Sequence, residues 1–228
     1  MADKNLHKDH RKRLRKRYAE EGIDFFEDHN VLELLLFYAL PRVDTNPIAH
    51  RLISRFGSLS GVFSASEDEL CEVEGMGKAS ARFIKLVADS ARQCELRELS
   101  RLRMDRTERP GAYFVKWFST APWESSCMMS LDPSMKFISC DILNWGDEDR
   151  PVSICDTALS LARERKASKV ILAHSHGDGK MRPSPDDINL TREISREMEK
   201  HSVQVVSHYI VSGYDYIDII DRCFPKEN

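Results

Sequence analysis

The first hundred residues carry apolar side chains at intervals of three and four, which is the spacing that gathers them on one face of a helix. This pattern predicts one helix after another over residues 9–100. A buried helix is predicted over residues 31–38, because apolar positions fill it and Pro41 stops it. Pro47 suits the first turn of the next helix, and a long helix is predicted to begin at Lys78.

The hydrophobic period changes beyond Pro110-Gly111, a pair that together with the charged stretch 101–109 predicts a domain boundary or linker. Strands interleaved with helices then predict an α+β or α/β domain. We therefore predict an all-helical domain over residues 1–105 and a mixed-sheet domain flanked by helices over residues 106–228. The predicted strands are 127–131, 137–143, 169–176 and one or two strands within 203–220, and the predicted helices are 154–166 and 185–201.

Composition supports a folded protein without a general affinity for nucleic acid. Hydrophobic residues make up 41% of the 228 residues and charged residues 31%, so a packed core is expected and wholesale disorder is not. The net charge of −3 requires that any DNA contact come from a local patch. One basic run, residues 8–17, is either such a patch or a solvated helix face.

The sequence contains no segment that suggests export or membrane insertion. Its N-terminus is charged rather than apolar, unlike a secretory signal. The longest apolar run, residues 31–40, contains Glu33 and is too short to cross a bilayer. Six cysteines without a close pair are typical of buried thiols in a reduced compartment. We predict a cytoplasmic protein with no membrane partner.

Residues 70–81 resemble a helix-hairpin-helix motif. Gly75 and Gly77 permit a tight turn, and the freed amides at the start of the second helix can hold a phosphate, with Lys78 adding charge. This predicts non-specific DNA contact, although two glutamates flank the turn and would repel phosphate. The alternative is a turn that only packs, and in either case we expect Gly77→Val to spoil it.

A candidate metal site follows the strand predicted at residues 169–176. His174 and His176 are two positions apart, so their imidazoles leave the strand on the same side. The stretch 177–183 is rich in loop formers and can bring Asp187 back as a third ligand. Two nitrogen ligands and a carboxylate leave the fourth position of Zn²⁺ open, as in catalytic sites. Asp187 also has a structural explanation, because Ser184 and Asp187 have the spacing of a capping box.

The spacing His-x-His-x7-Ser-x2-Asp matches the JAMM signature of MPN-domain metallopeptidases. With the hairpin before it, the chain resembles the bacterial RadC family, in which a helix-hairpin-helix region precedes a JAMM domain. The resemblance implies one Zn²⁺ per chain and hydrolysis of a peptide or isopeptide bond in a peptide or protein conjugate. It assigns Glu124, which precedes a hydrophobic strand, to handling the water, and Ser184 to donating to the oxyanion.

The sequence departs from the family pattern beside the ligands. The usual His-Asn-His-Pro-Ser-Gly run and a Pro-Arg-Glu element are both altered, and without the proline a looser loop and a different substrate choice are expected. Asp178 is either a competing ligand or a loop residue. His208 is either a partner behind the site or a core histidine. The altered runs read His174-Ser175-His176-Gly177-Asp178-Gly179 and Pro151-Val152-Ser153.

Three other functions were weighed against a zinc metallohydrolase. A nucleic-acid-binding, DNA-repair-associated module with a structural or vestigial JAMM site would have no need of Glu124. A zinc deaminase requires His-x-Glu and a downstream Pro-Cys-x-x-Cys, which this sequence lacks. A metal-dependent nuclease gathers more carboxylates for hard cations. The sequence therefore predicts a zinc-dependent hydrolase that uses metal-activated water, and does not identify its substrate.

Overall fold

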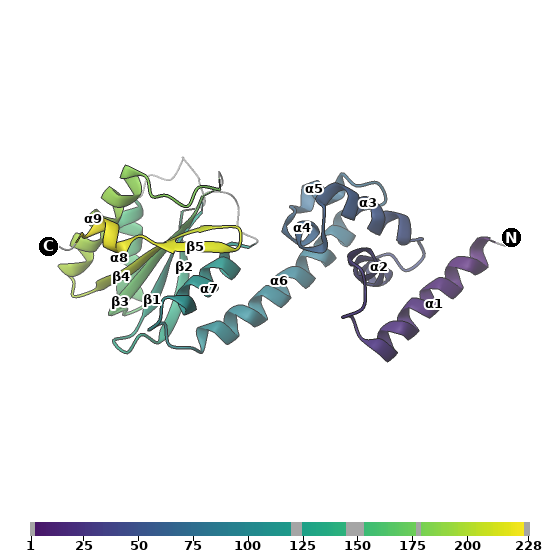
Figure 1. Cartoon of the computed structure of the whole chain (residues 1–228), viewed down its shortest axis with the longest axis horizontal. Helices are drawn as coiled ribbons and strands as arrows, with labels where there is room; N and C mark the ends of the chain where they lie inside the picture. The colour runs from purple at the N-terminus through teal and green to yellow at the C-terminus, as the bar shows by residue number, and fades with distance from the viewer. Residues whose placement is uncertain (1–2, 120–124, 145–152, 177–178, 226–228) are drawn as a thin grey trace. The chain divides into compact units, whose positions relative to one another are not determined.

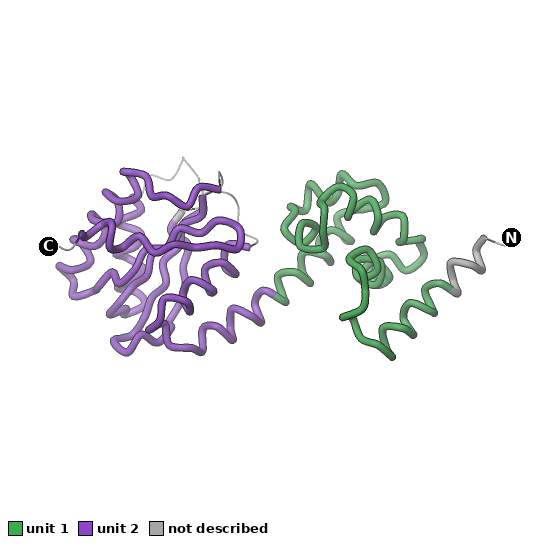
Figure 2. Tube along the Cα trace, in the orientation of Figure 1, with its two compact units in different colours: residues 1–91 green, residues 92–228 purple. Residues whose placement is uncertain are grey.

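The N-terminal part of the computed structural model is helical (Figure 1). The residues that the structure describes are 3–119, 125–144, 153–176 and 179–225. The chain divides into two compact units, residues 1–91 and 92–228 (Figure 2), and the predicted domain limit between residues 105 and 106 stays a prediction. The first unit contains α1 (Asp3–Glu21), α2 (Asp28–Ala39), α3 (Asn46–Phe56), α4 (Leu59–Ser64), α5 (Glu67–Cys71) and the beginning of α6 (Lys78–Ser100).

Local signals in the sequence explain where these helices start and stop. Helix α2 ends before Pro41, and Pro47 lies in the first turn of α3, where its missing N–H is not needed. At the start of α5, the Ser66 hydroxyl accepts from the Glu69 amide at 3.2 Å, and the Glu69 carboxylate accepts from the Ser66 amide at 2.8 Å. The buried core of the unit is aliphatic and includes Leu32, Leu36, Ile48, Leu52, Val62, Leu70 and Ile84.

Gly75, in the turn between α5 and α6, is a position that this core requires to be glycine. Its φ is 92°, and a Cβ there would lie 2.8 Å from Cδ1 of buried Ile48. Gly75→Ala is therefore expected to destabilise the first unit by about 1–3 kcal/mol. Each kcal/mol should lower the unfolding midpoint of a unit of this size by about 4–8 °C, as measured by differential scanning calorimetry.

Gly77→Ser is the matched control, because Gly77 is exposed and no atom lies within 4 Å of a Cβ built there. Its free energy of unfolding should stay within about 0.5 kcal/mol of the parent protein. Of the two glycines expected to permit the turn, Gly75 is thus the one at which backbone conformation and packing require glycine, and the expected effect of Gly77→Val stays a prediction. Equal unfolding midpoints for the two variants would contradict this assignment.

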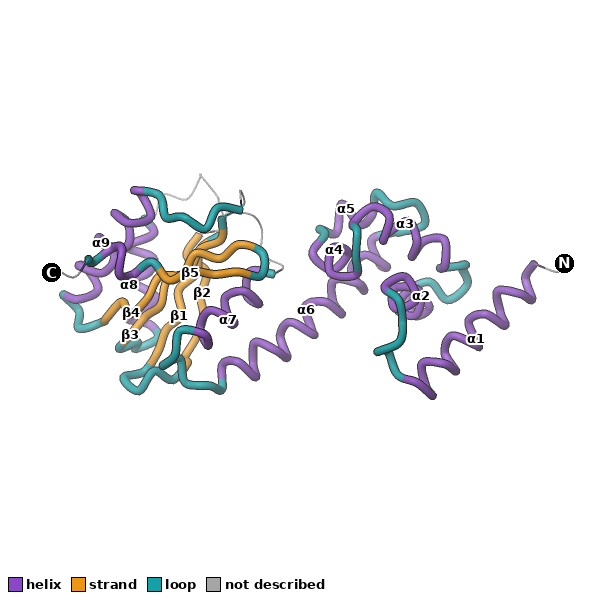
Figure 3. Tube along the Cα trace, in the orientation of Figure 1, coloured by secondary structure: helices purple, strands orange, loops and turns teal. Residues whose placement is uncertain are grey.

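A five-stranded mixed sheet lies at the centre of the second unit (Figure 3). The strands lie in the order β2-β1-β3-β4-β5; β3 and β4 pair in parallel, and the other neighbours are antiparallel. In this register Ser126 lies opposite His174, and Leu172 lies opposite His208. The predicted strands are present as β1 (Ser126–Leu131), β2 (Phe137–Asn144), β3 (Lys169–Ser175), β4 (Gln204–Ser212) and β5 (Asp215–Asp218).

Helices cover both faces of this sheet (Figure 1). Helix α7 (Glu108–Phe118) packs on one face through Phe114. Helices α8 (Ile154–Glu164) and α9 (Pro185–Glu199) cover the other face, where Leu172 is buried against them. A short α10 (Ile220–Cys223) packs against α9 and β4. Because side chains alternate along a strand, His174 shares the face of Leu172 and lies on the side of α8 and α9.

The predicted linker at Pro110-Gly111 is wrong, because both residues lie inside α7. Proline is tolerated in the first turn of a helix, where the backbone N–H has no partner within the helix. A Cβ at Gly111 would lie 2.3 Å from the Tyr216 ring, so glycine allows the helix to approach β5 closely. A pair of residues that usually ends a helix therefore serves close packing here.

The cysteines and helices carry no sign of a disulfide frame or a membrane span. No helix among the described residues is both long and apolar enough to cross a membrane. The cytoplasmic location stays a prediction. All six cysteines are free: Cys127, Cys155 and Cys223 are buried, Cys71 and Cys140 are partly buried, and Cys94 is exposed.

Candidate metal centre

Two histidines stand at the end of β3, where the strand leaves the sheet. His174 lies within β3, and His176 follows the strand by one residue, so both imidazoles point to the same side as the alternation predicts. Ser175, which lies between them, is hydrogen-bonded to Ser125, the residue just before β1. Its amide donates to the Ser125 carbonyl at 3.0 Å, and its hydroxyl accepts from the Ser125 amide at 3.2 Å.

Asp187 reaches the same place from the first turn of α9. Ser184 caps this helix, and its hydroxyl accepts from the Asp187 amide at 3.1 Å. In return, Oδ2 of Asp187 accepts from the Ser184 amide at 2.7 Å and from the Ser184 hydroxyl at 2.8 Å. The capping box is therefore present, and it uses Oδ2 of the carboxylate, whereas Oδ1 faces His174.

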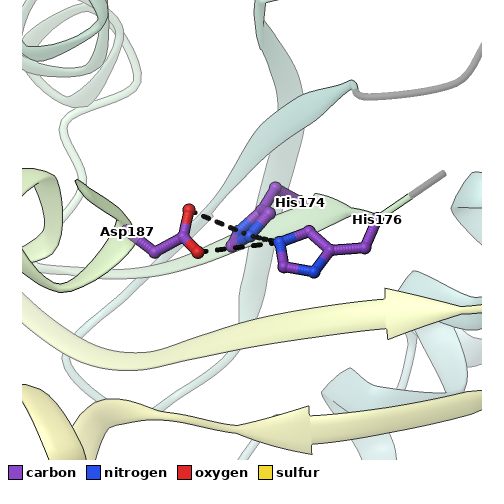
Figure 4. Close-up of side chains that lie close together, drawn as sticks. All are labelled: His174, His176 and Asp187. Atoms are coloured by element: carbon purple, nitrogen blue, oxygen red, sulfur yellow. Dashed lines mark hydrogen bonds and ion pairs between the residues drawn. The ribbon is translucent and has the colours of Figure 1, made fainter. Parts of the chain in front are cut away.

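The three side chains meet closely (Figure 4). The two Nε2 atoms of His174 and His176 are 2.9 Å apart. Oδ1 of Asp187 lies 3.3 Å from Nε2 of His174, and Oδ2 lies 3.6 Å from Nε2 of His176. Burial on its own would raise the pKa of the Asp187 carboxyl. The neighbouring His174 imidazole and the hydrogen bonds from Ser184 outweigh it and hold that pKa well below its usual range, so the carboxylate is ionised.

A backbone carbonyl fixes the tautomer of His176. Its Nδ1 lies 2.8 Å from the carbonyl oxygen of Lys180, which can only accept a hydrogen bond. Nδ1 of His176 must therefore carry the proton. In the neutral imidazole this leaves the lone pair on Nε2, the atom that faces the cluster.

A chain of hydrogen bonds from Thr191 through His208, here called the relay, fixes the tautomer of His174. The Thr191 hydroxyl donates to the Asp187 carbonyl, so it can only accept from Nδ1 of His208, 2.6 Å away. Burial, with the neighbouring His174, lowers the pKa of His208 to about 3, so this ring is neutral and Nε2 is its acceptor. Nδ1 of His174, 2.8 Å from that Nε2, must then be the donor. The lone pair of His174 is left on its own Nε2.

The arrangement fits a zinc ion. Two imidazole nitrogens and a carboxylate oxygen converge, all within 4.8 Å of one another, and in the neutral imidazoles these two nitrogens carry lone pairs. Three acceptors facing each other require a cation or a shared proton between them. Nitrogen and carboxylate ligands suit Zn²⁺, and histidines held from behind by hydrogen bonds are typical of zinc sites.

Comparison with known proteins places the chain in a family. Residues 104–222, more than half of the chain, match the family model described as RadC-like JAB domain. The chain belongs to the RadC family. A UPF0758 protein of Fusobacterium nucleatum subsp. nucleatum is 31% identical over 225 residues, which cover 93% of this chain and 95% of that relative. The resemblance to RadC proteins that the sequence motifs indicated is confirmed, whereas the name of this relative states no activity.

The relay behind His174 leads to a prediction about metal affinity in this RadC protein. Thr191→Val removes the hydroxyl and keeps the shape of a fully buried side chain. His208 is then free to take the other tautomer and to donate to His174, which would place a proton on the Nε2 atom that faces the cluster. Zinc affinity should fall by about 10- to 100-fold, as measured by competition with a chelator.

Thr191→Ser is the control for this substitution, since it keeps the hydroxyl and loses only a methyl group. It should bind zinc about as tightly as the parent protein. If the valine and serine variants bound zinc equally well, the relay would have no part in holding His174.

Two residues that sequence reasoning assigned near the site lie outside the described residues: Glu124, predicted to handle the water, and Asp178, weighed as a competing ligand. Their roles stay predictions. The structure does describe Ser184, whose proton is directed at Asp187 Oδ2. Its predicted role as an oxyanion donor is not tested by this contact. His208, which sequence reasoning left as either a core histidine or a partner of the site, is both.

The predicted nucleic-acid-binding residues of this RadC protein lie in the turn between α5 and α6. The amide of Gly77, expected to be free for a phosphate, donates to the Ser80 hydroxyl at 2.9 Å. Lys78 is exposed at the first position of α6. The flanking Glu74 carbonyl accepts from Arg51 at 3.1 Å, so the turn is tied to α3. The helix-hairpin-helix identity and DNA contact stay predictions.

The basic run of α1 is partly used inside the first unit. Arg11 donates to the carbonyls of Leu40 and Pro41 at 2.8 and 2.9 Å, and its guanidinium lies 4.6 Å from the centre of the Phe37 ring. Lys12 and Arg13 are exposed. The run therefore combines packing contacts with a solvated face, and DNA binding by that face stays a prediction.

Proposed function

We propose that this RadC protein is a zinc-dependent metallohydrolase of the JAMM type that cleaves a peptide or isopeptide bond in a peptide or protein conjugate. One observation carries the proposal. The lone pairs of His174 and His176 converge with the Asp187 carboxylate, and hydrogen bonds from behind fix both imidazoles in the tautomer that points them there. These three side chains would hold one Zn²⁺ per chain.

The chain's own residues would handle protons and charge around that ion. When bound, Zn²⁺ polarises a carbonyl and lowers the pKa of water toward ~7. Glu124 takes a proton from the attacking water and passes it to the leaving amine as the C–N bond breaks. Ser184 donates to the oxygen on which negative charge builds. To do so its hydroxyl turns away from Asp187 Oδ2, which keeps its hydrogen bond from the Ser184 amide at 2.7 Å.

The alternative is a nucleic-acid-binding, DNA-repair-associated module whose JAMM site is structural or vestigial. Structural zinc sites are usually closed by four protein ligands. Within the described part of the chain, the cluster offers three. The residues described therefore favour an open, catalytic site over a closed one.

Two measurements on the purified full-length protein test the proposal. Elemental analysis is expected to find one zinc per chain. Fluorogenic peptides and ε-lysyl isopeptide conjugates should include a substrate whose hydrolysis stops on chelation and returns when zinc is added back. Protein that stays free of zinc after incubation with stoichiometric zinc would contradict the proposal.

A further inference from the structure

A cavity of about 370 Å³ adjoins the candidate metal centre. His174, His176 and Asp187 form part of its wall, so whatever enters the cavity lies beside these three side chains. Small-molecule pockets span roughly 300–1,000 Å³. A cavity at the lower end of this range has room for a side chain or a short aliphatic group, and none for a folded domain.

The rest of the cavity wall is largely aliphatic. Leu172 comes from β3, Ile154 from α8, and Leu190 and Ile194 from α9, with Leu143 of β2 completing this side. Apart from the candidate metal ligands and His208, no described residue of the wall is ionisable except Cys127, which burial keeps as a thiol by raising its pKa. A charged group entering the cavity would lose its hydration without gaining a partner beyond the ligands. The wall therefore selects an aliphatic group.

Ser125, Ser126 and Ser175 add polar positions to this wall, and Ser126 is the one whose hydroxyl has no partner among the described residues. It is the direct neighbour of His174 across the β1–β3 pair. Its hydroxyl oxygen is buried and has no hydrogen-bond partner in the described part of the chain. Buried hydroxyls are ordinarily hydrogen-bonded. Once the Ser126 side chain turns its hydroxyl toward the cavity, a bound molecule with a polar group beside an aliphatic one, such as the backbone amide and side chain of an amino-acid residue, would satisfy it.

We propose that this cavity, the aliphatic pocket, is the specificity pocket of the enzyme. It takes the aliphatic side chain of the substrate residue next to the scissile amide, and the Ser126 hydroxyl bonds to the backbone of that residue. The inference rests on the proposed function, because it places the scissile bond at His174, His176 and Asp187. Substrates with a leucine-like side chain at this position are thus favoured over those with glycine, lysine or glutamate.

Straight-chain hydroxamates test the pocket, because the hydroxamate group binds zinc and the alkyl chain then extends from it. Their dissociation constants for the zinc-loaded full-length protein would be measured by isothermal titration calorimetry, from acetohydroxamate to hexanohydroxamate. Burial of each methylene should tighten binding by roughly two- to fourfold. Over the four added methylenes, the gain should be roughly 16- to 250-fold.

Two variants on different helices, Leu190→Trp and Ile154→Trp, fill the pocket and leave the ligand residues themselves unchanged. Each should reduce the gain from acetohydroxamate to hexanohydroxamate to less than about twofold. Leu102→Trp, at an exposed leucine outside the cavity, is the control and should keep the full gain. If one filled variant fails to fold, the other variant and the chain-length series in the parent protein still test whether the pocket takes the alkyl chain.

Two results would contradict the assignment of the aliphatic pocket as the specificity pocket and leave the metal centre unaffected. One is acetohydroxamate binding that does not tighten with chain length. The other is an undiminished gain in a folded, zinc-loaded filled variant. Failure of the parent protein to take up zinc is a different result, visible in the zinc stoichiometry before any hydroxamate is added. It would overturn the proposed function, and this inference with it.

Discussion

His174→Ala is expected to remove zinc from the purified protein, lowering its content from one equivalent per chain to a trace. The substitution deletes one of three convergent ligands and also leaves Nε2 of buried His208 without its partner. In the parent protein, zinc at a hundred times its dissociation constant should stabilise the fold by about 2.7 kcal/mol. In the variant, added zinc should not shift the unfolding midpoint. Elemental analysis and calorimetry measure the two effects.

His201→Ala is the matched control for this loss. His201 is an exposed histidine just beyond α9 whose ring lies 2.8 Å from Arg163, and among the described residues it belongs to no cluster of candidate ligands. Its removal should leave both the zinc content and the stabilisation by zinc unchanged. A His174→Ala protein that still bound zinc one to one, with parental affinity, would mean that the convergence of these side chains does not make a metal site.

The secondary structure of the second unit was largely predictable, because its signals are local. The run at β3 is a short apolar segment rich in β-branched residues, and Ser184, Pro185 and Asp187 mark the start of α9 by their own chemistry. The predicted strands and helices of this region lie within two residues of the observed ones at most ends. The pairing of β3 with β4 in parallel was not predictable in the same way, because it depends on contacts distant in sequence.

Helix α7 shows where local signals mislead. Charged residues followed by Pro110-Gly111 usually indicate a linker, and the sequence predicts one here. In the structure, Tyr113 and Phe114 of the same segment are buried in the core on one face of the sheet. The free energy of burying these aromatic rings outweighs the weak helix propensity of the glycine. Tertiary packing therefore decided an element that propensity alone would reject.

The candidate site, too, was predictable from the sequence only in part. The spacing of His174, His176 and Asp187 could be identified from sequence, because two of them share a strand and the third starts a helix. The relay behind them could not, since His208 and Thr191 reach His174 from separate elements, and only the register that sets Leu172 opposite His208 brings them together. The aliphatic pocket likewise has walls from four strands and two helices, and no sequence motif marks it.

Glu124→Gln is expected to keep zinc and to lose hydrolysis. The prediction rests on the RadC resemblance, which assigns Glu124 to the water and not to the metal. The next residue, Ser125, is hydrogen-bonded through its amide and carbonyl to Ser175, which stands between the two histidines in sequence. Glutamine keeps the shape of the side chain but cannot accept a proton. The rate should therefore fall by about 10²–10⁴-fold, the usual contribution of a general base.

The two halves of this prediction are measured together, as zinc content and as turnover of the same conjugate at saturating zinc. Glu199→Gln is the matched control, because Glu199 is an exposed glutamate at the end of α9, and this variant should keep both quantities. A Glu124→Gln protein that lost zinc along with activity would make Glu124 a ligand. One that kept full activity would mean that another group takes the proton from the water, and that the glutamate at this position of the RadC pattern is not the base.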